Sequence, residues 1–406
     1  NGKKMGMNAF IVEGTRSPIG SFGGALKGVR ADDLAAHSIS SLISKVKNLD
    51  LGLIADIYFG CANQAGEDNR NVARMASLLA GIPDSVPAET INRLCASGLS
   101  SVLHAQRAIS SGAGDFILAG GVEHMTRSPF VISKPSKAFG TDSKMYDSSF
   151  GWRFVNSKFN KVFGTEAMGE TAENLVDQYA ISREDQDGFA LWSQIKTERA
   201  RTGGVLSEEI SPITIPQRKS QDITISHDEF PKPQSSLEGL AKLKPAFRNE
   251  GSVTAGNASG LNDGSCALLL ASEKGVNALG TNPLTRVVCG ASVGVEPRTM
   301  GIGPVLASEK ALKMSGLKLG QMDLIEINEA FSAQVLSCTR SMGLEDKDPR
   351  INPNGGAISL GHPLGMTGAR LALTASKELV RSRGKYALVT MCVGVGQGFA
   401  VILERQ

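Results

Sequence analysis

Short apolar runs and segments of helical spacing alternate through the first third of the chain. The apolar runs are typical of buried strands that end at glycine or proline: AFIVEGTRSPIG (9–20), IADIYFG (54–60) and DFILAGG (115–121). A further strand is predicted to run through Thr90. Helical spacing fills the intervals, at DDLAAHSISSLIS (32–44), at 69–79, and from about Cys95 to Ser110. This alternation predicts an α/β fold built from β-α-β units.

A comparable order returns from Pro283 to the end of the chain. Strands are predicted in TRVVCGASVG (285–294), MDLIEINEA (322–330) and YALVTMCVGVG (386–396), with helices in LASEKALKMSG (306–316) and HPLGMTGARLALTASKEL (362–379). When Cys95 is laid on His362, Gly98 falls on Gly365. The chain therefore looks duplicated, with one reactive side chain at a helix N-terminus in each half.

The segment between the two halves has a different character. It is polar, broken and rich in charge and proline, as in SKPSKAFGTDSKMYDSSFGWRF (133–154) and PQRKSQDITISHDEFPKPQ (216–234). It also carries a helix for which Ser182 is a plausible N-cap, with Asp185 at the third position. We interpret 127–261 as an inserted loop domain for CoA and substrate contacts. The N-terminal half is then 1–126, completed by 262–284, and the C-terminal half is 285–406.

Composition excludes several classes of protein. The 406 residues hold 43 Lys plus Arg against 40 Asp plus Glu, a net charge of +3 without long runs of one sign, so nucleic acid is a poor partner. No stretch resembles a membrane span, and the first ten residues lack the apolar core of a signal peptide. Six scattered cysteines argue against a disulfide framework and against a metal cluster. We expect a cytoplasmic enzyme without a bound metal.

Cys95, in NRLCASG, is a candidate nucleophile because it immediately precedes a predicted helix with small residues in its first turn. The helix dipole and free backbone N–H groups there would lower the pKa of the thiol and bind a developing oxyanion. The alternative is a small buried hydrophobic residue, which is the commoner fate of a single cysteine.

Two further segments carry candidate chemistry near the C-terminus. His362 precedes a helix and lies among five glycines, at 355, 356, 361, 365 and 368, which permit close backbone approach, although lone histidines are usually structural. Cys392, in MCVGVGQG, follows an apolar strand and precedes alternate glycines, and GVGQG is not a dinucleotide fingerprint. Asn328, in NEAFSAQ, could donate a side-chain hydrogen bond or could be a helix N-cap, with Phe331 in the core.

Five segments resemble the thiolase family, in the family's order and across essentially the whole chain: NRLCASG, VTAGNASGLNDG, NEAFSAQ, NPNGGAISLGHPLGMTGAR and MCVGVGQG. The resemblance implies a thiolase fold, with two βαβαβαββ halves packed as five α-β-α-β-α layers around an inserted loop domain. It also implies a coenzyme-A-dependent acyltransferase whose cysteine, matched by Cys95, becomes acylated. His362 then activates that thiol, and Cys392 is the general acid and base.

The same resemblance implies the binding groups. Backbone N–H groups of Cys95 and Gly394 form one oxyanion site, and His362 with a water held by Asn328 forms another. Ser259 is expected beside the pantetheine arm. Met168 and Phe331 are expected beside the acyl end, and Lys232 near the nucleotide, where several relatives carry an arginine. Coenzyme A and acetyl-CoA are then substrates, no cofactor is permanently bound, and relatives form homodimers or homotetramers.

The acyl substrate is the finer question. DSSFGWRFVN (147–156), GCANQAGEDNRNVARMASLLAG (60–81) and MGIGPV (300–305) resemble the 3-oxoadipyl-CoA thiolase branch, and Ala167 stands where many acetoacetyl-CoA thiolases have histidine. A terminal carboxylate entering a partly dry pocket needs a cationic or hydrogen-bonding partner, for which Arg153 is our candidate, although it could equally be a surface or dimer-contact residue. The alternatives are an acetoacetyl-CoA or medium-chain thiolase, a β-ketoacyl synthase, which would carry histidine in place of Cys392, and a non-catalytic acyl-CoA-binding protein.

Overall fold

A computed structural model describes residues 7–406 of the chain. Its first half follows the order strand, helix, strand, helix, strand, helix and two strands, with β10 returning after the insertion to lie between β1 and β5. These elements are β1 (Ala9–Arg16), α1 (Ala31–Lys45), β3 (Ile54–Gly60), α2 (Val72–Leu79), β4 (Glu89–Ile91), α3 (Ser97–Ser110), β5 (Phe116–His124) and β10 (Asn262–Ser272). The sheet order of this half is β4-β3-β5-β10-β1.

The second half repeats this topology. Its sheet order, β12-β13-β14-β11, matches β3-β5-β10-β1, and the strand equivalent to β4 is reduced to a single bridge between Ile325 and Ile351. The elements are β11 (Thr285–Gly294), α9 (Gly303–Ser315), β12 (Leu324–Ile327), α10 (Ser332–Ser341), α12 (Leu364–Ser382), β13 (Tyr386–Val393) and β14 (Gln397–Arg405). The duplication expected from the sequence is therefore confirmed.

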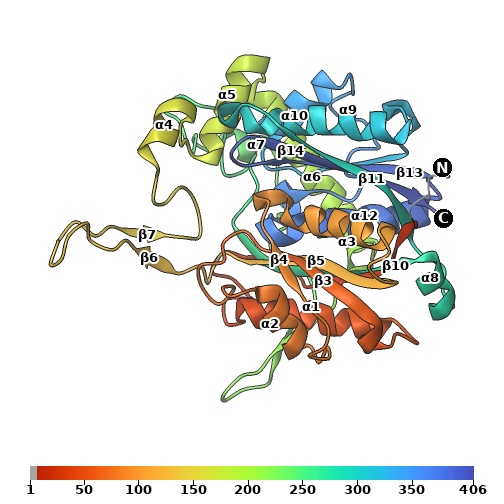
Figure 1. Cartoon of the computed structure of the whole chain (residues 1–406). Helices are drawn as coiled ribbons and strands as arrows, with labels where there is room; N and C mark the ends of the chain where they lie inside the picture. Colours follow the sequence, from red (N-terminus) through yellow and green to blue (C-terminus); the bar gives the residue numbers. More distant parts are fainter. Residues whose placement is uncertain (1–6) are drawn as a thin grey trace.

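The two halves stack in five layers, as Figure 1 shows: α1 and α2, one part of the sheet, α3 with α12, the other part of the sheet, then α9 with α10. Antiparallel pairing of β1 with β11 joins the two parts into one ten-stranded sheet. The strands are buried because helices cover both faces, which explains their nearly continuous apolar runs.

Glycines allow the two central helices to approach closely. A Cβ on Gly98 of α3 would lie 2.7 Å from the carbonyl oxygen of Gly365 in α12, and one on Gly368 would lie 2.3 Å from the backbone nitrogen of Leu99. Only glycine permits this separation, so both motifs are needed to bring the two helix N-termini together.

The segment 127–261 covers one side of the two halves (Figure 1). Its elements are β6 (Phe130–Ile132), β7 (Met145–Asp147), α4 (Ser157–Phe163), α5 (Met168–Tyr179), α6 (Arg183–Thr202), β8 (Ile213–Ile215), β9 (Ile223–Ile225) and α7 (Leu237–Ala241). The Ser182 hydroxyl accepts the backbone N–H of Asp185 at 3.0 Å, which confirms the expected N-cap of α6. Buried Arg16 pairs with Glu209 and Asp228, and so ties this segment to β1.

The remaining short elements are β2 (Gly20–Ser21), α8 (Glu273–Leu279) and α11 (Ala357–Leu360). Within residues 7–406, each helix is too short or too polar to cross a membrane. The first six residues, which belong to the stretch examined above for a signal peptide, lie outside the described residues.

Candidate active site

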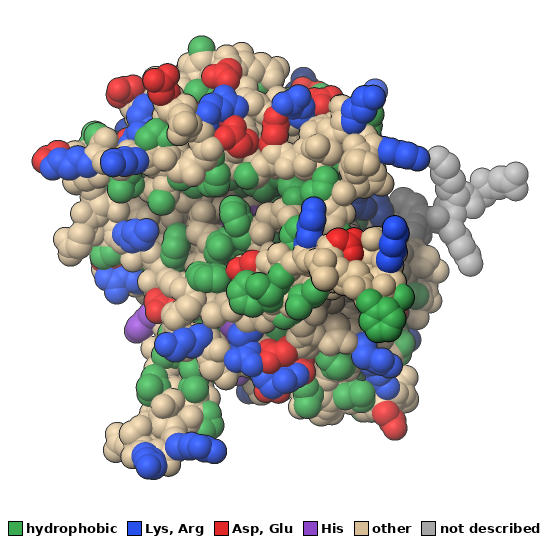
Figure 2. All heavy atoms as spheres, turned by 90° about the vertical axis from the view of Figure 1, so that its left-hand side faces the viewer, with side chains coloured by type: hydrophobic (Ala, Val, Ile, Leu, Met, Phe, Trp, Pro, Cys, Tyr) green, Lys and Arg blue, Asp and Glu red, His purple; other side chains and the backbone are tan. Residues whose placement is uncertain are grey.

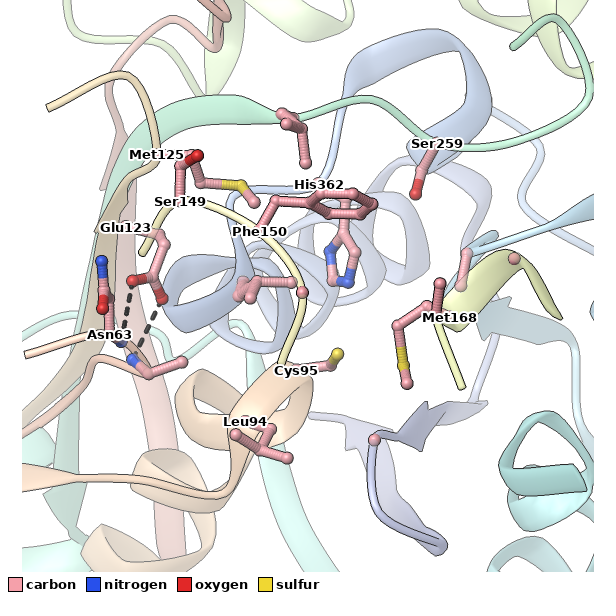
Figure 3. Close-up of a pocket in the computed structure, with 18 of the residues that line it drawn as sticks. Asn63, Leu94, Cys95, Glu123, Met125, Ser149, Phe150, Met168, Ser259 and His362 are labelled. Atoms are coloured by element: carbon pink, nitrogen blue, oxygen red, sulfur yellow. Dashed lines mark hydrogen bonds between the residues drawn. The ribbon is translucent and has the colours of Figure 1, made fainter. Parts of the chain in front are cut away.

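One cavity of about 330 Å³ brings together residues from both halves and from the segment 127–261. Eight of the ten site residues predicted from the sequence line it: Cys95, Arg153, Met168, Ser259, Phe331, His362, Cys392 and Gly394. Figure 3 shows the Cys95 thiol and the His362 imidazole in its middle, with Ser259 and Met168 to one side and Asn63, Glu123 and Ser149 to the other. The cavity therefore extends in two directions from Cys95 and His362.

Cys95 lies in a 3₁₀ turn, Leu94–Ala96, that leads directly into α3. The preceding Leu94 has φ of 45°, a backbone conformation that costs energy for a non-glycine residue and is typical of functional sites. Desolvation raises the pKa of the Cys95 thiol to about 11, although backbone hydrogen bonds from Gly394 and from Cys95 itself act to lower it. Burial outweighs the helix N-terminus here, so the pKa of Cys95 lies above its usual value, opposite in direction to the lowered pKa expected from the sequence.

His362 is held by α12, whose first turn includes its hydrogen-bond partner Thr367. The Thr367 hydroxyl donates to the Pro363 carbonyl at 2.8 Å, so its oxygen is left to accept from Nδ1 of His362 at 2.7 Å. The imidazole then carries its proton on Nδ1 and presents an unprotonated Nε2. Burial, with a smaller effect from Arg370, lowers the pKa of His362 to about 3, so the ring is neutral at rest.

Asn328 does not line the cavity, but its side chain contacts His362, which does. Its Nδ2 lies 3.4 Å from Nε2 of His362, while its Oδ1 is buried and has no hydrogen-bond partner among residues 7–406. The alternative reading of Asn328 as a helix N-cap is wrong, because α10 begins at Ser332 with Phe331 at the cap position. The free amide oxygen can hold a water molecule next to the histidine.

Cys392 is the second-last residue of β13 and is buried. Desolvation, with a smaller contribution from Cys95, raises its thiol pKa well above the usual value. A thiol that stays protonated in this position can donate a proton to a developing carbanion and can take one back. Gly394 follows in the turn that places its backbone N–H toward Cys95.

The expected binding residues separate into two groups. Met168 begins α5, and Phe331 packs edge-on against Phe247 with ring centroids 6.1 Å apart, so both give the cavity an apolar wall. Ser259 lies next to Phe331 through a backbone bridge at Ala258. In contrast, Lys232 is exposed outside the cavity, and its ammonium lies over the ring of Phe230.

Arg153 reaches the cavity from the loop before α4. Its Nη2 donates to Oδ1 of Asn63 at 2.8 Å, and its Nη1 donates weakly to the Ser148 carbonyl at 3.4 Å. It forms no ion pair with any of residues 7–406. The guanidinium therefore keeps its charge and several N–H donors for a ligand.

Sequence reasoning missed Glu123, whose buried carboxylate also lines the cavity. It accepts backbone N–H groups from Ala62 at 3.0 Å, Asn63 at 3.1 Å and Gly365 at 2.8 Å, and desolvation raises its pKa to about 7. Cys61 and Asp68 lie close enough to form a possible metal-binding group with it, but these carboxylates are already engaged by backbone N–H donors. The signal in the sequence for Glu123 was a charged residue near the end of the otherwise apolar strand β5, in DFILAGGVEH.

Comparisons with known proteins agree with this geometry. The thiolase N-terminal domain model matches residues 9–274, and the thiolase C-terminal domain model matches residues 281–405. The chain is 56% identical to a beta-ketoadipyl-CoA thiolase of Escherichia coli over 98% of this chain and 99% of that protein. It is 52% identical to a beta-ketoadipyl-CoA thiolase of Acinetobacter baylyi over 98% and 99% of the two chains. The solved Bacillus anthracis acetyl-CoA acetyltransferase superposes with a TM-score of 0.92 at 38% identity, covering 100% of both chains. The chain belongs to the thiolase family and is an acyltransferase.

Proposed function

We propose that the enzyme cleaves 3-oxoadipyl-CoA with coenzyme A to give succinyl-CoA and acetyl-CoA. The observation that carries this proposal is Arg153, a cation without an anionic partner among residues 7–406, which lines the same cavity as Cys95. A carboxylate that leaves water needs such a partner. The full-length likeness to the beta-ketoadipyl-CoA thiolases supports the same substrate.

The first step is attack of Cys95 on the C3 ketone. The thiol and imidazole rest as a neutral pair, because burial raises the pKa of Cys95 and lowers that of His362. Nε2 of His362 takes the proton as the sulfur–carbon bond forms, and the ketone oxygen becomes an oxyanion. Backbone N–H groups of Cys95 and Gly394 stabilise that oxygen, and loss of one such donor typically costs about 10²–10³ in rate.

In the second step the C2–C3 bond breaks. Its electron pair moves into the acetyl-CoA enolate, whose oxygen is held by His362 and a water on Asn328, and Cys392 protonates the carbon. Acetyl-CoA leaves and a succinyl group stays on Cys95. The Cys392 thiolate then takes the proton of incoming coenzyme A, whose sulfur displaces Cys95 and forms succinyl-CoA, and the departing Cys95 sulfur takes back the proton from Nε2 of His362. Coenzyme A is thus a substrate, with Ser259 and Lys232 along its path, Met168 and Phe331 beside the acyl end, and no permanent cofactor in the scheme.

Turnover of 3-oxoadipyl-CoA, acetoacetyl-CoA and a medium-chain 3-oxoacyl-CoA tests the substrate. We expect the highest kcat/KM for 3-oxoadipyl-CoA. Preference for either of the other two would reject the dicarboxylic substrate while leaving the thiolase reaction intact. Acetoacetyl-CoA is the second candidate, because the superposed Bacillus anthracis protein is an acetyl-CoA acetyltransferase. Under the main proposal, the enzyme takes part in the degradation of aromatic compounds. We place this activity in the cytoplasm.

We propose further that the protein is a homodimer or homotetramer. The β6–β7 hairpin projects away from the layers in Figure 1. It exposes Phe130, Ile132 and Met145 at 67%, 66% and 64%. Figure 2, which views the molecule from that side, has hydrophobic side chains gathered over the middle of the face. Such patches are typical of protein interfaces, and light scattering during gel filtration would measure the mass of the assembly.

A further inference from the structure

Asn63 lies between Arg153 and two serines at one end of the cavity, in the loop that follows β3. Its Oδ1 accepts from Nη2 of Arg153 at 2.8 Å, and its Nδ2 lies 2.6 Å from the Ser128 hydroxyl and 3.3 Å from the Ser148 hydroxyl. Its side-chain amide therefore has a partner at both the oxygen and the nitrogen.

The neighbouring hydroxyls fix which way this amide faces. Ser148 donates its proton to the Pro129 carbonyl at 2.6 Å, and Ser128 donates to the His124 carbonyl at 3.2 Å. Both hydroxyl oxygens are then left as acceptors, so the NH₂ group of Asn63 must face them. The carbonyl oxygen is consequently directed at Arg153.

The neutrality of Asn63 matters for Arg153. An amide oxygen orients the guanidinium through a hydrogen bond but leaves its charge uncompensated, whereas a carboxylate in the same place would form a close ion pair. An arginine already paired with an internal carboxylate would bind a substrate carboxylate poorly. The aspartate side chain has almost the same shape as asparagine, so the exchange adds a negative charge beside Arg153 and also removes the NH₂ donor to Ser128 and Ser148.

The backbone of Asn63 connects this end of the cavity to the reacting end. Its N–H donates to Glu123, and the same carboxylate accepts the N–H of Gly365 in the first turn of α12, just beyond His362. Figure 3 draws Asn63 and Glu123 together on one side of the Cys95–His362 pair. These hydrogen bonds fix the position of Arg153 relative to His362 and Cys95.

We propose that Asn63 is a positioning residue for dicarboxylic substrates: it aims the Arg153 guanidinium into the cavity and leaves its charge free for the terminal carboxylate of a 3-oxoacyl-CoA. This inference rests on the proposed function, because it assumes that Arg153 binds that carboxylate. It assigns Asn63 no contact with the thioester or with Cys95.

The test compares Asn63→Asp and Asn63→Ala with the wild-type enzyme on 3-oxoadipyl-CoA and acetoacetyl-CoA. Asn63→Asp should lower the ratio of kcat/KM for 3-oxoadipyl-CoA to that for acetoacetyl-CoA by about 10- to 100-fold, mainly through KM. Asn63→Ala should lower the ratio less, because the charge of Arg153 stays free. Asn277→Asp, the same change on the exposed face of α8, should leave the ratio unchanged.

Two results would overturn the inference. One is an unchanged ratio in Asn63→Asp in an enzyme whose wild type prefers 3-oxoadipyl-CoA. The other is an equal loss on both substrates, which would mean that Asn63 only supports the fold, and melting temperatures of the variants would check that reading. A wild type that prefers acetoacetyl-CoA would instead reject the proposed substrate. A double variant with Arg153→Ala should show no additional loss of the ratio beyond Arg153→Ala alone, since Asn63 acts through that arginine.

Discussion

The hydroxyl oxygen of Thr367 lies 2.7 Å from Nδ1 of His362, and the same hydroxyl donates a hydrogen bond to the Pro363 carbonyl. The threonine is therefore the acceptor that keeps the imidazole proton on Nδ1, and Nε2 is left unprotonated, as the proposed role of base requires. The role is comparable to that of a carboxylate that orients a catalytic histidine, but here a neutral hydroxyl performs it.

Thr367→Val should impair catalysis with little change in shape. Valine keeps the branched side chain but removes the acceptor, so the imidazolium that forms during attack loses a hydrogen bond worth about 1.5–3 kcal/mol, and kcat should fall by about 10- to 100-fold. Thr367→Ser retains the oxygen and is the matched control. Steady-state kinetics of both variants measure this, and equal activity of valine and serine variants would contradict the assignment.

Cys95 should be the first thiol alkylated by limiting iodoacetamide, and acetyl-CoA should protect it. Burial raises the pKa of both Cys95 and Cys289 to about 11, so access decides between them: Cys95 opens to the cavity, whereas Cys289 donates its thiol proton to the Ala311 carbonyl. Peptide mapping, with Cys289→Ser as control, identifies the labelled residue. Loss of activity in proportion to labelling of any other cysteine would refute the nucleophile.

The same raised pKa predicts how alkylation depends on pH. The thiolate is the reactive form, and below a pKa of about 11 its fraction increases tenfold for each pH unit. The labelling rate of Cys95 in the free enzyme should therefore increase by about tenfold per unit from about pH 6 to about pH 9. A plateau near neutral pH would instead indicate a preformed thiolate–imidazolium pair.

Cys392→Ala should separate the two half-reactions. The variant should still become acylated at Cys95 by acetyl-CoA, more slowly than the wild type because Cys392 also handles the coenzyme A proton, but it should lose carbon–carbon cleavage, because the enolate carbon has no other proton donor in our scheme. Cys95→Ala should lose both. Mass spectrometry of the acyl adduct and a cleavage assay provide the two measurements. Normal cleavage by Cys392→Ala would exclude it as the general acid.

Arg153→Ala should depress cleavage of 3-oxoadipyl-CoA by about 2–3 kcal/mol, or about 30- to 150-fold, while sparing acetoacetyl-CoA. The reason is loss of a charged hydrogen bond to the substrate carboxylate. Lys158→Ala, which removes an exposed charge from α4, is the control. An equal loss on both substrates would mean that Arg153 does not select the substrate.

Local patterns in the sequence were enough for the alternating strands and helices of the two halves, whereas the five-layer arrangement was implied by the resemblance to the thiolase family. The apolar runs of β1, β3 and β5 and the helical spacing of α1 and α3 can be recognised from residues that are close together in the sequence. The Ser182 cap likewise depends on two residues that are three positions apart. The pairing of Cys95 with His362 came from the likeness of two motifs. Glu123 went unnoticed because its partners include a backbone N–H group far away in the sequence, and Thr367 because its contact with His362 depends on how the chain turns into α12.

The sequence by itself determined the order of strands and helices and indicated Cys95, His362 and Cys392 as candidate reactive residues, since both kinds of information lie in contiguous motifs. Only the tertiary structure decided their protonation, because the pKa of a side chain depends on its burial. The helix N-terminus predicts a lowered pKa for Cys95, whereas desolvation in the folded protein raises that pKa. Likewise, the contact of Arg153 with Asn63 joins residues 90 positions apart. That contact exists only after the segment 127–261 folds over the cavity, and no local pattern encodes it.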